Sequence, residues 1–443
     1  MKRVQRFASL WGRSLRRLVF LLALVSALLL ALPAALGQTL TLLHTFAGNG
    51  LDGSYPHAGL TMDRAGNLYG TAAGGEGVCE GGDPPCGTVF KLTHTGSDWI
   101  FSVLYTFQGG SDGYLPEAPV IFGPDGALYG TTSWGGNDEC QFLNYHGCGT
   151  VFNLKPPVTT CKTALCSWTE TVVYRFTGGS DGDSPYIGSL IFDRAGNVYG
   201  TDWDGTAGGG TVYQLSPSSG GWLPTVLYAF TDGKDGGTPY AGPTFDTTGN
   251  LWGTTLYGGI VGCENPQLPE PCGVLYELVR SGSGWTEKPL FLFNKSVGGQ
   301  PVGELILDSS GNLYGIASTD GPSGEGVVFA FTPSTGTYNI LFSFSSATGP
   351  PFAGLIMDGS GSLYGTTIHG GAYGHGTVFK LARSNGGWAY TDLHDFAGGS
   401  NDGANPAGRL VMDANHNLFG TTLNGGSSRQ CYGGCGVVFE ISP

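Results

Sequence analysis

One short phrase, Gly-Asn-Leu-Tyr-Gly-Thr, recurs with small variations seven times along this 443-residue chain. A motif that returns every few tens of residues marks an architecture in which one structural unit is repeated and each copy packs on the next. The fold must therefore accommodate seven similar units. The copies occupy residues 66–71, 126–131, 196–201, 249–254, 311–316, 361–366 and 416–421.

Each unit contains four short segments with the pattern of β-strands. In the first unit these are residues 57–63, 68–71, 87–92 and 99–107, separated by a turn, a Gly-rich loop and a polar turn. The fourth segment alternates most clearly, with an aromatic or aliphatic side chain at every second position, as a pleated strand requires. No segment after residue 37 shows a helical period. Seven four-stranded antiparallel units without helices predict an all-β fold, a seven-bladed β-propeller.

The two ends of the repeat region complement each other. The last unit stops after its third strand, residues 436–441, and residues 40–46 have the pattern of a fourth strand without the other three. We therefore expect the N-terminal strand to pair with the last blade, which closes the ring and leaves no open edge between the first and last blades. Residues 38–443 should then form a single domain.

Residues 1–37 have the anatomy of a secretory signal peptide. Six Lys and Arg residues come first, an unbroken run of apolar and small residues follows at 18–32, and Ala35 and Gly37 occupy the −3 and −1 positions of a cleavage site. The alternative is an uncleaved anchor, but this run is short for a membrane span, which needs about 20 residues. We predict cleavage and export, so that the mature protein is secreted, periplasmic or at the cell surface.

The ten cysteines fall into five pairs of near neighbours. An even number, local pairing and an export signal together predict five disulfides. Metal sites are the alternative, but the spacings are unusual for zinc, and no second Cys or His pair stands in a fixed relation to each pair. The predicted disulfides are Cys79–Cys86, Cys140–Cys148, Cys161–Cys166, Cys263–Cys272 and Cys431–Cys435.

The chain is acidic, with 20 Lys and Arg against 34 Asp and Glu and a formal net charge of −14. An acidic surface repels nucleic acid and anionic membranes, and no basic cluster follows the signal peptide. We therefore expect neither nucleic acid nor, after cleavage, a membrane as a partner. We expect a monomer without a cofactor or metal, whose partner is an extracellular carbohydrate or protein.

The repeated elements also resemble a known family. The phrase Gly-Asn-Leu-Tyr-Gly-Thr-Thr, followed by Gly-Gly, Gly-Thr-Val-Phe-x-Leu, Trp-x7-Phe and Gly-Gly-Ser-Asp-Gly, is similar to the Gloeo-Verruco (GloVer) tandem repeat. The resemblance covers residues 39–443. It implies an exported bacterial protein of the choice-of-anchor type, and it brings no established activity and no catalytic residues to carry over.

Aspartates recur at two places in the repeat. One opens the turn Asp-x-x-Gly-Asn, as at Asp63, and we interpret it as hairpin chemistry, because Asp accepts hydrogen bonds from the amides that follow. The other lies in the connection between units, where its oxygens would suit either calcium or the capping of a turn. Calcium takes six to eight oxygens, so one Asp per connection favours capping. These residues are Asp52, Asp112, Asp181, Asp235 and Asp402.

A candidate binding site follows from comparing the copies. In an antiparallel blade, the long loops between the second and third strands share one end of the ring with the connections between blades, and long loops on a rigid scaffold favour binding residues. A position after Gly-Thr-Thr varies among copies, whereas the glycines around it are constant. Its side chains either face a shared central opening or simply pack between blades. The candidate ligand-binding residues are Trp134, Trp203, Tyr257 and His369.

Three functions remain open. The first is a binding module for extracellular carbohydrate or protein. The second is a lyase or hydrolase of polysaccharide or a small cyclic molecule that uses His369 with Asp202 or Asp204, which requires these side chains to converge in one pocket. The third is a structural component of the envelope or matrix. Because no catalytic constellation is evident, we favour a protein that is not an enzyme.

Overall fold

A computed structural model describes residues 38–443, apart from residues 75–85, 97, 138, 143–144, 158–167, 206–207, 264–269 and 283. Residues 40–441 form one compact unit. The predicted signal peptide, residues 1–37, lies outside the described residues. Among the described residues, no helix is long and apolar enough to cross a membrane.

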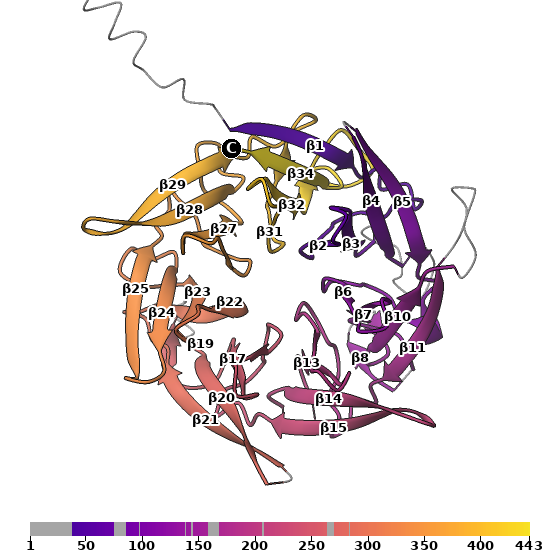
Figure 1. The fold of residues 1–443 in the computed structure, drawn as a ribbon, viewed down its shortest axis with the longest axis vertical. Helices are drawn as coiled ribbons and strands as arrows, with labels where there is room; N and C mark the ends of the chain where they lie inside the picture. The colour runs from indigo at the N-terminus through magenta and orange to yellow at the C-terminus, as the bar shows by residue number, and fades with distance from the viewer. Residues whose placement is uncertain are drawn as a thin grey trace, which may run out of the picture. The chain divides into compact units, whose positions relative to one another are not determined.

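The unit consists of seven four-stranded antiparallel sheets arranged around a ring, which confirms the predicted seven-bladed propeller (Figure 1). Taken from the innermost strand outward, blades 1 to 7 are β2 (Thr61–Met62), β3 (Leu68–Ala72), β4 (Thr88–Thr95) and β5 (Asp98–Thr106); β6 (Ile121–Phe122), β7 (Leu128–Thr132), β10 (Thr150–Lys155) and β11 (Thr169–Arg175); β12 (Ile191–Phe192), β13 (Val198–Asp202), β14 (Thr211–Ser218) and β15 (Gly221–Ala229); β16 (Thr244–Phe245), β17 (Leu251–Thr255), β20 (Val274–Ser281) and β21 (Gly284–Leu292); β22 (Gly299–Leu307), β23 (Leu313–Thr319), β24 (Val327–Thr332) and β25 (Thr337–Ser343); β26 (Ile356–Met357), β27 (Leu363–Thr367), β28 (Thr377–Ser384) and β29 (Gly387–Asp395); and β31 (Val411–Met412), β32 (Leu418–Thr422), β34 (Val437–Ser442) and β1 (Thr39–Thr45).

One end of the ring carries the loops between second and third strands and the crossings between blades, and we call this end the loop face. Its short elements are three two-stranded pairs and one 3-10 turn, which is the only helical structure in the described residues and lies in the crossing from blade 1 to blade 2. These elements are the pairs β8 (Gln141–Phe142) with β9 (Tyr145–His146), β18 (Val261–Cys263) with β19 (Glu270–Pro271) and β30 (Gly403–Ala404) with β33 (Asn424–Gly425), and the turn η1 (Gly110–Asp112).

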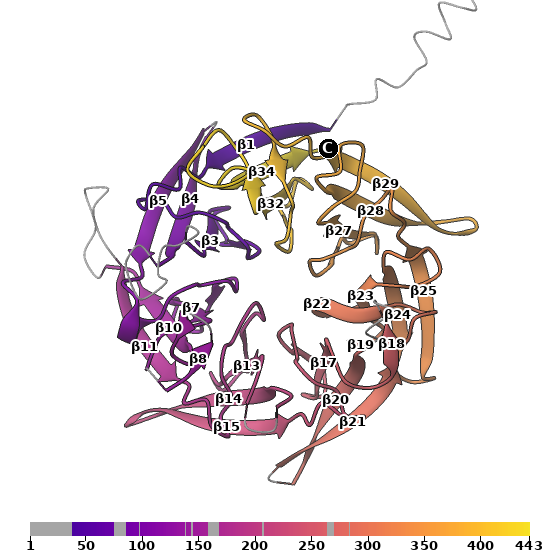
Figure 2. The same cartoon turned by 180° about the vertical axis from the view of Figure 1, so that it is seen from behind.

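The first and last strands of the propeller pair as predicted. The indigo β1 lies beside the yellow β34 in both views and supplies the outermost strand of blade 7 (Figures 1 and 2). The backbone N–H of Phe46 donates to the carbonyl of Gly436 at 3.1 Å, just beyond the paired strands. Blade 7 is therefore assembled from both ends of the unit.

The Asp-x-x-Gly-Asn turns form hairpins between the first and second strands. Oδ1 of Asp63 accepts hydrogen bonds from the N–H groups of Ala65 and Asn67, both at 2.9 Å, and Oδ2 accepts from the side chains of Asn67 and Tyr69. Partial burial opposes ionisation of Asp63, but these hydrogen bonds outweigh it and hold its pKa below the ordinary value. The prediction of hairpin chemistry is confirmed at this turn.

The second glycine of the repeated phrase lies beneath an aromatic ring of the next strand. A Cβ on Gly253 would stand 2.3 Å from Oη and 2.5 Å from Cζ of the buried Tyr276. A bulge between Leu275 and Tyr276 in the pairing with β21 accompanies this packing. The same glycine–ring contact occurs in every blade, between Gly70 and Phe90, Gly130 and Phe152, Gly200 and Tyr213, Gly315 and Phe329, Gly365 and Phe379, and Gly420 and Phe439.

Neighbouring blades are tied together near the axis and stacked at the periphery. In blades 1, 3 and 7 the threonine of the phrase donates a hydrogen bond to the next blade: Thr71 to the Ala118 carbonyl at 3.0 Å, Thr201 to the Ala241 carbonyl at 3.2 Å and Thr421 to the Ala58 carbonyl at 2.8 Å. On the outer strands, aromatic rings of adjacent blades stack, and Phe291 lies 4.1 Å from Tyr338 between ring centroids. These contacts join neighbouring blades both near the ring axis and on the outer strands.

A carboxyl group replaces the outer ring at two of these interfaces. Glu287 lies near Tyr228 and Asp235 of the preceding blade, and burial followed by repulsion from Asp235 raises the pKa of Glu287 to about 7. Glu170 is placed in the same way near Asp112, and burial raises its pKa to about 7. Both carboxyls favour the protonated form in the folded protein.

We expect replacement of Gly253 by Ala to destabilise the fold by about 1–3 kcal/mol, because the new methyl group must displace the Tyr276 ring. Gly284→Ala is the matched control, since a Cβ there meets nothing within 4 Å. Chemical denaturation of both variants would check this. Equal stability of the two would contradict the proposed packing constraint.

The raised carboxyl pKa values predict that stability falls as pH rises from 6.5 to 8. A raised carboxyl pKa stabilises the fold fully below the ordinary value of 4.5, and that contribution is lost as pH rises through about 7. Glu287→Gln should flatten the pH dependence by less than about 1 kcal/mol, because water reaches part of the group. Thermal unfolding at several pH values would measure this. A variant whose pH dependence matched the wild type would refute it.

Candidate functional site

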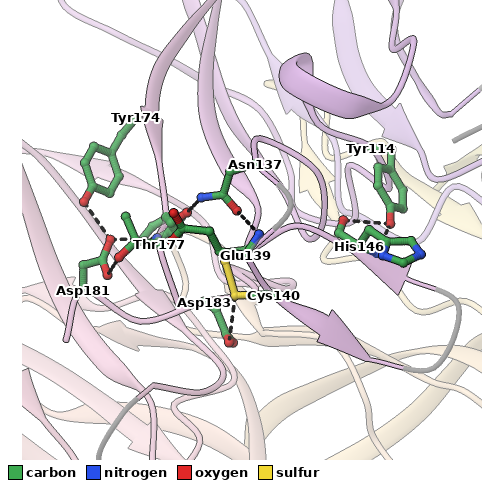
Figure 3. Close-up of a disulfide and its surroundings, with 11 residues drawn as sticks. Tyr114, Asn137, Glu139, Cys140, His146, Tyr174, Thr177, Asp181 and Asp183 are labelled. Carbon is green, nitrogen blue, oxygen red and sulfur yellow. Dashed lines mark hydrogen bonds between the residues drawn. A yellow bond between two sulfur atoms is a disulfide. The ribbon is translucent and has the colours of Figure 1, made fainter. Parts of the chain in front are cut away.

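The aspartates of the crossings cap their own loops. Oδ2 of Asp181 accepts hydrogen bonds from the Tyr174 hydroxyl at 2.8 Å and from the Thr177 N–H at 2.9 Å (Figure 3). Asp112 and Asp235 make the equivalent pair of bonds. Within the described ranges, no group of three or more His, Cys, Asp and Glu side chains is placed to hold a metal ion. The geometry supports the capping interpretation over calcium ligation.

Three of the predicted disulfides are present in the loops between second and third strands: Cys140–Cys148, Cys263–Cys272 and Cys431–Cys435. Cys86 is also disulfide-bonded. The predicted Cys79–Cys86 pairing and the Cys161–Cys166 pair fall on positions 79, 161 and 166, which lie outside the described residues.

Each of these disulfide-bonded loops supports the crossing that follows it. The N–H of Ser184 donates to the carbonyl of Cys148 at 2.9 Å, and the N–H of Tyr55 donates to that of Cys435 at 2.9 Å. Leu115 is bonded in the same way to Cys86, and Gln300 to Cys272. The disulfides therefore brace the crossings as well as their own loops.

The crossings turn inward at the residue that donates a hydrogen bond to the preceding loop, where the acceptor is a cysteine carbonyl or, for Thr238 and Asn405, the carbonyl of Gly209 or His375. Six such residues adopt left-handed backbone with φ between 51° and 58°, although none of them is glycine. A proline follows each one and rests on a glycine of the preceding blade; a Cβ on Gly87, for example, would lie 2.4 Å from Cδ of Pro116. Residues held in strained backbone cluster at functional sites. The six residues are Tyr55, Leu115, Ser184, Thr238, Gln300 and Asn405.

A small cavity lies near the ring axis, and residues that follow these prolines, such as His57 and Glu117, line it. Its volume is about 40 Å³, and residues of all seven blades line it, including His57, Glu117, Glu304 and Arg409. A wider cavity of about 820 Å³ follows along the innermost strands. We call the small cavity the neck. Glu304 lines both cavities, and its Oε1 accepts hydrogen bonds from the N–H and the hydroxyl of Ser189 two blades away, at 3.1 and 2.6 Å.

Aromatic rings from four blades gather around the neck at the loop face, in a group that we call the mouth. The ring centroid of His57 lies 6.1 Å from that of Tyr186 and 6.0 Å from that of Phe352. Trp203 lies 5.1 Å from Tyr186 and 5.9 Å from Tyr240, and 38% of its surface is exposed. Glu117 completes the mouth. These rings offer apolar surface beside a cavity that residues of all seven blades line.

The titratable groups of the mouth influence one another. Burial raises the pKa of Glu117 to about 7, although one oxygen accepts a 2.8 Å hydrogen bond from Oγ of Ser133. The negative charge of Glu117, followed by burial, raises the pKa of Tyr186, whereas burial followed by Glu117 raises that of Tyr240. Burial lowers the pKa of His57 to about 4, so this imidazole is neutral at pH 7.

The four residues predicted as ligand-binding reach different places. Trp203 belongs to the mouth. Trp134 is half-buried and stacks on Tyr145 at 5.3 Å, and Tyr257 is half-buried in a packed cluster. His369 is exposed, with Nδ1 3.0 Å from Nδ2 of Asn405. One of the four thus joins the central rings, and binding by any of them stays a prediction.

The proposed catalytic grouping of His369 with Asp202 or Asp204 is wrong. Asp202 ends β13 in blade 3 and is buried, where its carboxyl accepts hydrogen bonds from the N–H and hydroxyl of Thr211 at 2.9 and 2.5 Å. His369 follows β27 in blade 6, three blades away on the other side of the ring (Figure 1). The requirement for convergence in one pocket is therefore not met.

The sequence matches the Gloeobacter/Verrucomicrobia repeat family over residues 32–264, 164–360 and 262–443, which together span nearly the whole chain. The chain belongs to this repeat family. The match confirms the resemblance inferred from the repeated phrase. A search among curated proteins finds no match for this family member.

Solved structures are similar to this family member at low sequence identity. A chain of a mitotic checkpoint complex is 11% identical with a TM-score of 0.50, over 92% of this chain and 94% of that one. PorZ, a surface component of the type-IX secretion system of Porphyromonas gingivalis, is 13% identical with a TM-score of 0.49, over 89% and 47%. The periplasmic gluconolactonase PpgL of Pseudomonas aeruginosa is 15% identical with a TM-score of 0.44, over 81% and 95%. At these identities the likeness concerns the fold alone.

In this family member, loss of one disulfide should loosen the crossing that the disulfide supports. In Cys140→Ser/Cys148→Ser we expect a loss of about 2–3 kcal/mol of stability and faster hydrogen exchange at the Ser184 amide, which bonds to Cys148. The Thr238 amide is the internal control, because it donates at 2.7 Å to Gly209 and no cysteine is involved. Exchange measured by NMR would test this, and equal acceleration at both amides would argue against local bracing.

Proposed function

We propose that this protein is an extracellular carbohydrate-binding module whose site is the mouth. The observation that carries the proposal is the convergence of His57, Tyr186, Trp203, Tyr240 and Phe352 at the ring axis. The repeat itself does not need these rings, since the residue after the crossing proline is Val302 in blade 5 and Ala407 in blade 7. The crossing recurs from blade to blade, whereas the residue after its proline is aromatic in only some of the copies. A ring of unequal side chains on a repeated scaffold is suited to an asymmetric ligand.

The chemistry of the mouth supports a sugar as that ligand. Ligand sites combine apolar and aromatic walls with a few placed polar groups that fix orientation. Trp203 presents a partly exposed ring flanked by Tyr186 and Tyr240, against which the apolar face of a sugar can pack. The carboxyl of Glu117 and the carboxyl of Asp204, which follows Trp203, can accept hydrogen bonds from sugar hydroxyls.

The setting of the site also supports an extracellular role. Disulfides persist in oxidising environments such as the periplasm, the cell surface and the extracellular medium. The braced crossings hold the mouth residues on a rigid scaffold, which reduces the ordering cost of binding.

The proposal predicts that Trp203→Ala abolishes or weakens oligosaccharide binding about tenfold or more, because the mutation removes the exposed platform. Titration calorimetry with cello-, xylo-, manno- and chito-oligosaccharides would measure affinity for the wild type and the variant. Leu223→Ala is the control, since Leu223 is 59% exposed on the outer strand β15, away from the axis. Binding that survives Trp203→Ala, or no binding of any oligosaccharide, would contradict the proposal.

A further inference from the structure

A further cavity lies on the loop face, between the crossing from blade 6 to blade 7 and the disulfide-bonded loop of blade 7. Its volume is about 560 Å³, which falls within the range of about 300–1,000 Å³ that is usual for small-molecule sites. We call it the side pocket. Its lining comes from residues 398–405 on one wall and 424–434 on the other, and His375 of blade 6 completes it.

The wall formed by the crossing is closely packed on blade 6. The imidazole of His375 lies against Gly398, where a Cβ would come within 3.2 Å of Cδ2 and 3.3 Å of Nε2. The N–H of Asn405 donates to the His375 carbonyl at 2.8 Å. These contacts fix the imidazole and the crossing relative to each other before any ligand arrives.

The opposite wall is anchored as firmly. The disulfide Cys431–Cys435 closes its loop, and the hydroxyl of Ser428 donates to the Ala47 carbonyl at 2.6 Å. Nδ2 of Asn424 donates to the Tyr432 carbonyl at 3.2 Å. A pocket whose two walls are already ordered loses little conformational freedom on binding a ligand.

The side pocket carries positive charge, although the chain has a formal net charge of −14. Arg429 lines it, is exposed, and forms no ion pair among the described residues. No Asp or Glu belongs to the described lining. The nearby Asp402 caps its own crossing, where it pairs with His394 at 3.2 Å and accepts from the Ala397 N–H at 2.8 Å. The pocket therefore favours an anionic group.

The other lining residues suit a sugar. Tyr432 lines the pocket with 89% of its surface exposed, so its ring can pack against the apolar face of a sugar. The amide nitrogen of Asn424 is engaged within the loop, and its oxygen can accept a hydrogen bond from a sugar hydroxyl. The imidazole of His375 adds a further polar group. A ring, a cation and hydrogen-bonding groups are thus gathered around one cavity.

We propose that the side pocket is a second ligand site, which binds sugars that carry a carboxylate. The guanidinium of Arg429 would hold the carboxylate through two parallel, charge-assisted hydrogen bonds, while the sugar ring packs on Tyr432. The lining of the side pocket shares no residue with the neck or the mouth. The inference therefore goes beyond the function proposed for the mouth and does not depend on it.

The test compares two oligosaccharides that differ only in charge. Affinities of a galacturonic acid tetramer and of its full methyl ester would be measured by calorimetry at pH 7 in about 0.15 M salt, where charges beyond about 8 Å are largely screened. We expect the wild type to bind the free acid about tenfold more tightly, and Arg429→Gln to remove this preference. Tyr432→Ala should weaken binding of both forms, because both pack on the ring.

A matched control separates the pocket from general attraction to a cation. Arg194→Gln removes the same charge from an exposed turn between β12 and β13, at the other end of the ring, and should keep the tenfold preference. Equal binding of acid and ester by the wild type, or a preference that survives Arg429→Gln, would overturn the inference. Tetraglutamate presents carboxylates on a peptide, and binding as tight as that of the galacturonic acid tetramer would refute the sugar assignment.

The variant Trp203→Ala distinguishes failure of this inference from failure of the function proposed for the mouth. It should leave the preference for the free acid unchanged, because Trp203 does not line the side pocket. If the acid binds through Arg429 while neutral oligosaccharides do not bind, the side pocket is supported and the proposed function of the mouth fails. If neutral oligosaccharides bind through Trp203 and the acid shows no preference that depends on Arg429, the mouth is supported and this inference is refuted.

Discussion

The contact between a glycine of the second strand and an aromatic ring of the third underlies the whole propeller. The ring lies where a Cβ would otherwise stand, so that Tyr276 covers Gly253 and Phe90 covers Gly70. Because the ring is flattened against its own sheet, the next blade can pack closely on it, as the buried clusters between blades show. The phrase around this glycine recurs because each blade has to solve the same packing problem, whatever the protein binds.

The sequence predicted the parts of the structure that depend on local pattern. Strand alternation, the hairpin turns and the orphan strand at the N-terminus were each visible in nearby residues, and the pairing of β1 with β34 followed from counting strands. The candidate site was predicted only in part. Trp203 lies in the mouth, but most of the mouth comes from the residue after the crossing proline, such as His57 and Tyr186.

That position was missed for a physical reason. The crossing turns inward because non-glycine residues such as Tyr55 and Leu115 adopt left-handed backbone, which residue propensities disfavour. The strain is sustained by tertiary contacts, namely the hydrogen bond to a cysteine carbonyl and the proline packed on a glycine. A signal did exist in the sequence, since the residue after this proline varies among the copies as strongly as the position that was chosen.

The assembly of blade 7 from both ends of the propeller has a consequence for the order of events during biogenesis. β1 is the first strand to be synthesised and β34 is the last, so β1 has to remain unpaired until nearly the whole chain has emerged. Its contacts are the longest-range in the molecule, and they form after the other blades have their local hairpins. A chain of this design is thus exposed to edge-to-edge association for as long as its first strand lacks its partner, and it becomes resistant to such association when the last strand arrives.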